Sequence, residues 1–292
     1  MQIQLSGVSF IYEKKKKKKA ATLAPTVLKQ LNLTIHSGEM LAVAGKSGSG
    51  KSTFLQLLKG FLSPTTGSVL LDGVDPNTSK RPELFDQVGF IFQYPEHQLF
   101  ATTVFDDIAF GLQSAKLPGE IVEQRVRKAM ESVELDYEVF KDRSPFELSG
   151  GEKRRVAIAG VVVLEPKLLI LDEPTAGLDL PSRTALFELL HHMNKNQGLT
   201  IIWVSHQLDE IVSHASRLLA LQNGVFIADG SPEAALSDPV LLEAFGWEEP
   251  SALVVSRLLG QLGLSAGNTK LSPEEAAAII AAALNQHEII AK

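Results

Sequence analysis

Residues 45–52 constrain the fold of this chain more than any other part of its sequence. They read GKSGSGKS and follow the short apolar run at 40–44, so they match the pattern Gly-x-x-x-x-Gly-Lys-Ser/Thr between a buried strand and a helix expected from Lys51 to about Gly60. Glycines let backbone N–H groups turn inward toward phosphate oxygens, and the helix N-terminus adds its positive end. The chain is therefore predicted to bind a nucleoside triphosphate.

The side chains of this phosphate loop are expected to share two tasks. Lys51 should contact the β- and γ-phosphates, and the Ser52 hydroxyl should hold Mg²⁺. The residues predicted to bind the nucleotide here are Gly45, Lys46, Ser47, Gly48, Ser49, Gly50, Lys51, Ser52 and Thr53.

An acidic pair follows a second apolar run. Residues 167–171 are typical of a buried parallel strand, and Asp172 and Glu173 come directly after it. Because parallel strands present their carboxyl ends at the ligand crevice, both carboxylates are predicted to face the phosphates. Asp172 fits the carboxylate on the Mg²⁺ side. Glu173 should point to the other side of the strand end, where it can address the attacking water.

Composition and charge exclude several classes of protein. The 292 residues contain no cysteine, which excludes disulfides and thiolate sites. The 28 Lys and Arg against 34 Asp and Glu give a net charge of -6, which argues against a nucleic-acid partner. Neither a signal peptide nor a membrane-spanning apolar run is evident, so a partner would have to supply any spanning part. Six lysines at 14–19 indicate a solvated loop, with contact to anionic lipid headgroups or nucleotide phosphates as alternatives.

Strands and helices alternate along most of the chain, which indicates an α/β fold with a mostly parallel sheet. Strands are expected at 1–12, 27–35, 68–72, 88–92 and 200–205, with a hairpin at 217–229 around Asn223-Gly224. Residues 101–142 favour helices with a break at Pro118-Gly119, and further helices are expected after Ser149 and over 181–196. Beyond residue 231 helices predominate, including one that should begin at Ser272-Pro273 and enter the alanine-rich segment 276–284.

The pentapeptide LSGGE at residues 148–152 resembles the signature of ATP-binding-cassette (ABC) ATPases, and it lies about 20 residues before the acidic pair. These residues form a small-residue turn at a helix N-terminus. Because helix N-termini favour anions, this turn is a second potential anion-binding site within one chain. The resemblance implies that two such domains pair head-to-tail. Ser149, Gly150 and Gly151 would then cover the ATP held by the phosphate loop of the other subunit.

Four more positions match the ABC pattern one by one. The resemblance implies that Tyr12 stacks on adenine and that Gln93 touches Mg²⁺ or the water. Asp179 falls in the segment that meets the partner subunit, and His206 corresponds to the histidine that contacts the γ-phosphate. Glu173, His206 and Gln93 are therefore the expected catalytic residues, and Ser52, Gln93 and Asp172 the expected Mg²⁺ ligands.

A narrower resemblance covers nearly the whole chain. The segments 93–100 (QYPEHQLF), 103–111 (TVFDDIAFG) and 149–160 (SGGEKRRVAIAG) are similar to those of the ATPases of energy-coupling-factor importers. The implied fold is a P-loop ABC cassette over 1–230, with an antiparallel N-terminal β region and a helical subdomain at about 95–165. A small helical extension would occupy 231–292.

This second resemblance implies ATP hydrolysis coupled to uptake of a vitamin or a transition-metal ion, with ATP and Mg²⁺ bound. The implied partners are a second ABC ATPase in a homodimer or heterodimer, a transmembrane coupling protein and a substrate-binding membrane protein. The chain would be peripheral to the cytoplasmic face of the cell membrane. Tyr94, Leu99 and Phe100 suit a groove that receives helices of the coupling protein.

Two alternatives remain open at this point. The chain could serve another ABC system, such as a cobalt or nickel importer or an exporter. It could also be a soluble ABC ATPase of translation or DNA repair, although a single acidic cassette fits that class poorly. The sequence departs from the energy-coupling-factor pattern in an insert at about 13–25 and in Leu180, where proline is more usual.

Overall fold

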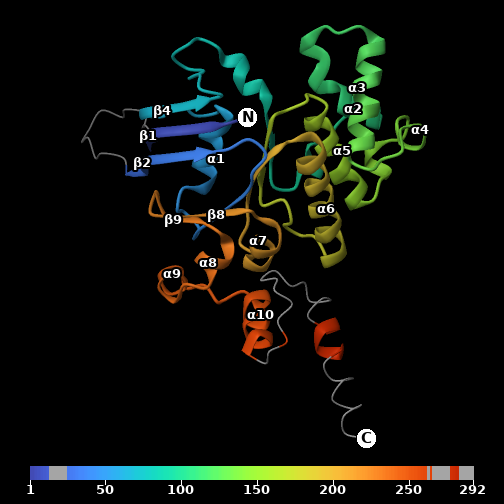
Figure 1. The fold of residues 1–292 in the computed structure, drawn as a ribbon. Coiled ribbons are helices and arrows are strands. Elements are labelled where there is room, and N and C mark those ends of the chain that lie inside the picture. Colours follow the sequence, from blue (N-terminus) through green and yellow to red (C-terminus); the bar gives the residue numbers. More distant parts are fainter. Residues whose placement is uncertain (13–24, 262–263, 265–276, 283–292) are drawn as a thin grey trace, which may run out of the picture.

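A computed structural model describes residues 1–12, 25–261, 264 and 277–282 of the chain (Figure 1). The lysine run at 14–19 and the helix start expected at Ser272 lie outside the described residues. Within the described part, no helix is long and apolar enough to cross a membrane.

A six-stranded sheet forms the centre of the molecule, and its strand order is β5-β6-β7-β3-β8-β9. All neighbours are parallel except β8 and β9, which form the antiparallel hairpin expected around Asn223-Gly224. Every residue of β3 and β7 is buried, because layers of structure cover both faces of the sheet. The strands are β3 (Met40–Ala44), β5 (Val88–Ile91), β6 (Leu168–Asp172), β7 (Thr200–Val204), β8 (Arg217–Gln222) and β9 (Val225–Gly230).

A smaller antiparallel sheet, β2-β1-β4, covers one side of the core. It consists of β1 (Ile3–Ile11), β2 (Thr26–Ile35) and β4 (Thr66–Leu71). The alternation read from the N-terminal sequence places Ile3 and Leu5 in the core, where they join the helix α1 (Lys51–Lys59) and one face of the large sheet. The expected antiparallel β region is therefore present.

The segment between β5 and β6 is helical and stands on the opposite side of the molecule from the small sheet (Figure 1). Helix α3 begins directly after Pro118, as the Pro-Gly break predicted, and buries Val126 and Met130 in the same cluster as α5. The helices are α2 (Val104–Ala109), α3 (Gly119–Ser132), α4 (Tyr137–Phe140) and α5 (Gly150–Val162). Short 3₁₀ turns accompany them at η1 (Pro82–Gln87), η2 (Pro95–Gln98), η3 (Phe110–Ala115) and η4 (Pro145–Glu147).

Helix α6 (Leu180–Gln197) follows β6 and matches the expected span closely. Helix α7 (Leu208–His214) follows β7, and the sequence patterns did not predict it. After the hairpin come α8 (Pro232–Leu236), α9 (Pro239–Phe245) and α10 (Ser251–Gln261), and residues 277–282 are also helical. Leu241 and Phe245 of α9 pack on Ala220 of β8, so the first helices of the extension lie against the central sheet.

Candidate active site

The phosphate loop joins the central strand β3 to α1, as its sequence predicted. Gly45 has a φ of 155°, and a Cβ atom there would lie 2.2 Å from the backbone oxygen of Leu221 on β8. Gly50 caps α1 with a φ of 110° in the left-handed region. Only glycine accepts both conditions without strain, so the loop can fold tightly over the end of the sheet.

Lys51 is buried at the start of α1, and its Nζ donates to the backbone oxygens of Gly45 at 2.7 Å and Lys46 at 3.2 Å. Burial lowers the pKa of Lys51, and the charges of Glu173 and Asp172 oppose that shift. The hydroxyl oxygen of Ser49 is buried without a hydrogen-bond partner among the described residues. A cradle with a buried ammonium and an orphaned hydroxyl fits phosphate oxygens as its missing partners.

Asp172 ends β6 close to Lys51. Burial raises the pKa of Asp172 first, and the neighbouring charge of Glu173 raises it further. A hydrogen bond with Ser52 and the charges of Lys51 and His206 oppose the shift. A partly desolvated carboxylate beside a hydroxyl supplies the hard oxygen donors that Mg²⁺ prefers, so these residues fit that ion.

Glu173 lies between two other residues that the sequence singled out. Its Oε2 accepts a hydrogen bond from Gln93 Nε2 at 3.1 Å, and its Oε1 is 3.1 Å from His206 Nε2. Gln93 follows β5, Glu173 follows β6 and His206 follows β7, so three adjacent parallel strands deliver the cluster at their carboxyl ends. The structure brings all three expected catalytic residues together.

Tyr12 lies just beyond the end of β1, at the start of α1. Its hydroxyl is 3.1 Å from Thr53 Oγ1, and its ring packs edge-on against Phe10 with centroids 4.8 Å apart. Tyr12 is 47% exposed, so part of it is accessible at the start of α1.

The signature residues occupy a separate place. Ser149 caps α5 in a capping box with Glu152, and within the described part of the chain no hydrogen bond or ion pair joins Ser149, Gly150 or Gly151 to the phosphate loop. A Cβ on either glycine would meet nothing within 4 Å. Asp179 caps α6, and hydrogen bonds from Ser182 hold its pKa below the usual value. These residues thus form open helix starts at the surface.

Sequence reasoning missed a buried ion pair behind this site. Arg154 of α5 is 5% exposed at its side chain, and its Nε lies 3.2 Å from Glu96 Oε2. Its Nη1 also donates to the backbone oxygen of Pro174 at 2.9 Å, which ties the signature helix to the residue after Glu173. The pattern of the α5 segment carried no signal for this pair, because both its neighbours along the chain, Lys153 and Arg155, are also basic.

Replacing Glu96 with alanine is expected to lower the free energy of unfolding by about 3 kcal/mol, because it leaves the buried Arg154 guanidinium without its counter-charge. Urea unfolding of the full chain measures this difference. Glu83→Ala is the matched control, since Glu83 pairs with Arg81 at the surface with side chains 58% and 55% exposed. Equal midpoint shifts for both variants would contradict the structural role of the buried pair.

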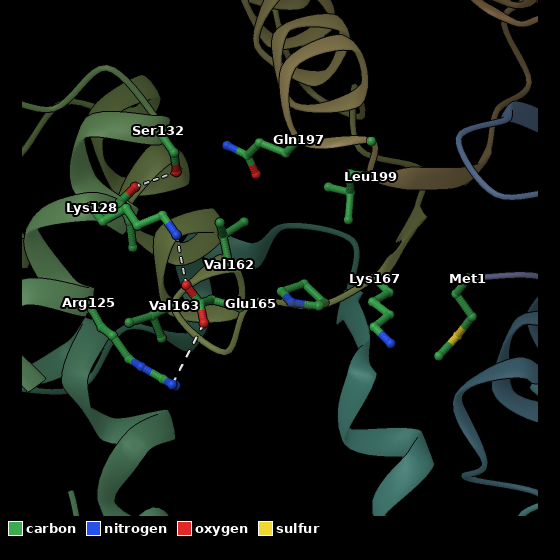
Figure 2. Close-up of a pocket in the computed structure, with 13 residues that line it drawn as sticks. Met1, Arg125, Lys128, Ser132, Val162, Val163, Glu165, Lys167, Gln197 and Leu199 are labelled. Atoms are coloured by element: carbon green, nitrogen blue, oxygen red, sulfur yellow. Dashed lines mark hydrogen bonds and ion pairs between the residues drawn. The ribbon is translucent and has the colours of Figure 1, made fainter. Parts of the chain in front are cut away.

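A cavity of about 570 Å³ lies away from all these residues (Figure 2). It is lined by α3, the ends of α5 and α6, and the segments that lead into β6 and β7, so it faces the amino ends of those strands. Glu165 pairs there with Lys128 at 2.8 Å and with Arg125 at 3.7 Å. None of the expected site residues lines this cavity, and its carboxylate Glu165 is already paired with both cations.

The sequence of this chain is similar to those of known ATP-binding proteins of transporters. Residues 28–176 match the family model described as ABC transporter. The chain is 41% identical to the energy-coupling factor transporter ATP-binding protein EcfA2 of Clostridium perfringens, over 91% of this chain and 92% of that protein. It is 42% identical to the protein of the same name from Symbiobacterium thermophilum, over 96% of each.

Two solved structures resemble the fold. CbiO1 from Clostridium perfringens, described as part of the ABC transporter complex cbiONQ, superposes with a TM-score of 0.73 and 34% identity over 89% of this chain and 96% of that one. The ATP-binding cassette MJ0796, in a dimeric post-hydrolysis state bound to ADP and Pi, has a TM-score of 0.66 and 28% identity over 79% of this chain and 98% of that one.

Proposed function

Because the chain belongs to the ABC transporter family and, within it, to the ATP-binding subunits of energy-coupling-factor transporters, we propose that it hydrolyses ATP at the cluster of Glu173, Gln93 and His206. Membership of this family makes it the ATPase of an importer. The observation that carries the assignment of the site is the convergence of these three side chains beside the phosphate loop, at the ends of β5, β6 and β7.

In this proposal each residue has one task. The phosphate loop and Lys51 bind the triphosphate, and Tyr12 packs on the base. Ser52, Asp172 and Gln93 are the residues that would hold Mg²⁺, which supplies positive charge beside the phosphate oxygens. Glu173 orients and polarises the attacking water as general base, and Gln93 fixes one of its oxygens. Lys51 and His206 stabilise the negative charge that develops on the transferred phosphoryl group.

A second ATPase subunit completes each site in this account. Ser149, Gly150 and Gly151 form an open helix N-terminus that is not joined to the chain's own phosphate loop, and Asp179 begins a neighbouring helix. Helix N-termini favour anions, so this surface suits the ATP bound by a partner. The partner would be either a second copy of this chain or a related ATPase.

Membrane partners would meet the chain at an aromatic surface near the end of β5. Phe100 is 59% exposed and packs edge-on against Phe110, which is itself half exposed. Tyr94 is also exposed, and Leu99 is partly buried against the core. Exposed aromatic rings in the segments that follow Gln93 along the chain support helix-in-groove docking of a transmembrane coupling protein. Docking of this kind would hold the chain at the cytoplasmic face of the membrane, where a substrate-binding membrane protein takes up a vitamin or transition-metal ion.

The test is affinity purification of the tagged full chain from detergent-solubilised native membranes, with mass spectrometry of the proteins that copurify. We expect a second cassette ATPase and a small multi-helix membrane protein, together with a substrate-binding membrane protein. Recovery of long exporter-type membrane domains would contradict the importer partners proposed here. Recovery of ribosomal or DNA-repair proteins without a membrane subunit would overturn the transport role and leave the ATPase chemistry standing.

A further inference from the structure

Glu210 joins two loops of the site and helix α6, although no sequence pattern marked it. It lies in the first turn of α7, with a side chain that is only 11% exposed. Its Oε2 accepts hydrogen bonds from Thr175 Oγ1 and from Ser205 Oγ, both at 3.0 Å. Its Oε1 lies 3.4 Å from Arg183 Nη1. One buried carboxylate therefore satisfies donors from three separate segments.

The bond with Thr175 acts on the backbone that carries Glu173. Glu173 has a φ of 48°, in the left-handed region that a residue with a side chain adopts only when its surroundings hold it there. The backbone N–H of Ala176 donates to the backbone oxygen of Glu173 at 3.1 Å. Thr175, which lies between these two residues, is 5% exposed. Anchoring Thr175 to α7 thus opposes relaxation of Glu173 to an ordinary conformation.

The bond with Ser205 acts on the backbone that carries His206. Ser205 is 3% exposed, and its hydroxyl both donates to Glu210 and accepts the backbone N–H of Gln207 at 3.0 Å. The exposed side chain of His206 lies between these two tethered residues in the chain. The separation between His206 and Glu173 is consequently set by two hydroxyls that meet at the same carboxylate oxygen.

The third contact is with Arg183 of α6, which connects Glu210 to the segment that leads into that helix. Arg183 donates from Nε to the backbone oxygen of Leu178 at 2.9 Å while its Nη1 faces Glu210. Leu178 immediately precedes Asp179, one of the residues expected at the subunit interface. The same carboxylate therefore connects the hydrolytic pair with that interface.

We propose that Glu210 is a positioning residue. It holds Glu173 and His206 at a fixed separation and links both to the segment before Asp179. This inference rests on the roles proposed for Glu173 and His206. Glu210 acts only through Thr175, Ser205 and Arg183, so it should affect the chemical step more than nucleotide binding at the phosphate loop.

Glu210→Gln tests the proposal without leaving a cavity. An amide has a single acceptor oxygen, and its NH₂ group must face either the two hydroxyls or the Arg183 guanidinium, so at least one bond is disturbed. For the variant in its membrane assembly, we expect kcat to fall about 10- to 100-fold while ATP affinity of the full chain changes less than about 2-fold. Amide hydrogen exchange of residues 175–178 should become faster.

Glu39→Gln is the matched control. Glu39 is a similarly buried carboxylate, 18% exposed and 3.2 Å from Arg217, but it precedes the start of β3, at the far end of that strand from the phosphate loop. We expect its kcat and its amide hydrogen exchange at residues 175–178 to match those of the parent chain. An unchanged kcat in Glu210→Gln, or equal losses in both variants, would overturn the proposal.

Two smaller changes keep the test decisive if Glu210→Gln folds poorly. Thr175→Val and Ser205→Ala each remove one hydroxyl and leave the carboxylate paired with Arg183. Each should lower kcat at unchanged ATP affinity, and the double variant should lose less than the two single effects combined. Full kcat in both would refute the proposal. Failure of the proposed function is distinguishable, because it would appear as undiminished hydrolysis in Glu173→Gln.

Discussion

A Glu173→Gln variant is expected to bind ATP as tightly as the parent chain but to hydrolyse it about 100- to 10,000-fold more slowly, which is the usual contribution of a general base. Glutamine keeps the size of the side chain and can still contact Gln93 and His206, each of which lies 3.1 Å from the carboxylate. It cannot accept the proton of the attacking water. The phosphate loop, which provides binding in this account, is untouched.

The measurement combines phosphate release by the membrane assembly with equilibrium ATP binding to the full chain. Glu188→Gln is the control, because Glu188 is an exposed carboxylate on α6 and the substitution changes the net charge in the same way. Hydrolysis at the parent rate by Glu173→Gln would remove Glu173 from its role as base. Loss of ATP binding would show instead that the residue belongs to the nucleotide cradle.

Much of the fold was predictable because its signals are local. The strand predicted at 40–44 and the helix predicted from Lys51 have the expected bounds, since an apolar run, a glycine loop and a capped helix are each defined by adjacent residues. The hairpin at Asn223-Gly224 and the start of α3 after Pro118 follow from turn chemistry in the same way. The antiparallel arrangement of the small sheet was predicted only from the family resemblance.

The contacts between distant segments were not predictable from the residues alone. Glu96 and Arg154 are 58 positions apart, and Thr175 and Glu210 are 35 apart, so no periodic pattern connects them. Helix α7 was not predicted because its seven residues span only about two turns. Two turns are too few to establish a 3.6-residue period of apolar positions. The place of Glu173 at the carboxyl end of a parallel strand was predicted from its residues, whereas Gln93 and His206 were assigned to the same site only through the family resemblance.

The same limit applies to the signature. Its residues predicted an anion-binding helix start, but only the structure reveals that Gly150 and Gly151 face open space and that, among the described residues, no hydrogen bond connects them with the phosphate loop. In the proposed mechanism, a site lacking these donors lacks part of the electrostatic stabilisation of the transition state. Removal of a single such donor commonly lowers turnover about 100- to 1000-fold.

In the proposed mechanism ATP is hydrolysed between two subunits. The most direct test is the hydrolysis rate per chain, compared between the isolated full chain and its membrane assembly. We predict a rate at least about tenfold higher in the assembly, because a partner then supplies the signature donors. Gly151→Asp should abolish this gain and leave ATP binding by the isolated chain unchanged, since the new side chain meets nothing within 4 Å of its Cβ and places a negative charge before the partner's phosphates. Equal rates in the isolated and assembled states, or full activity of the Gly151→Asp assembly, would contradict the account.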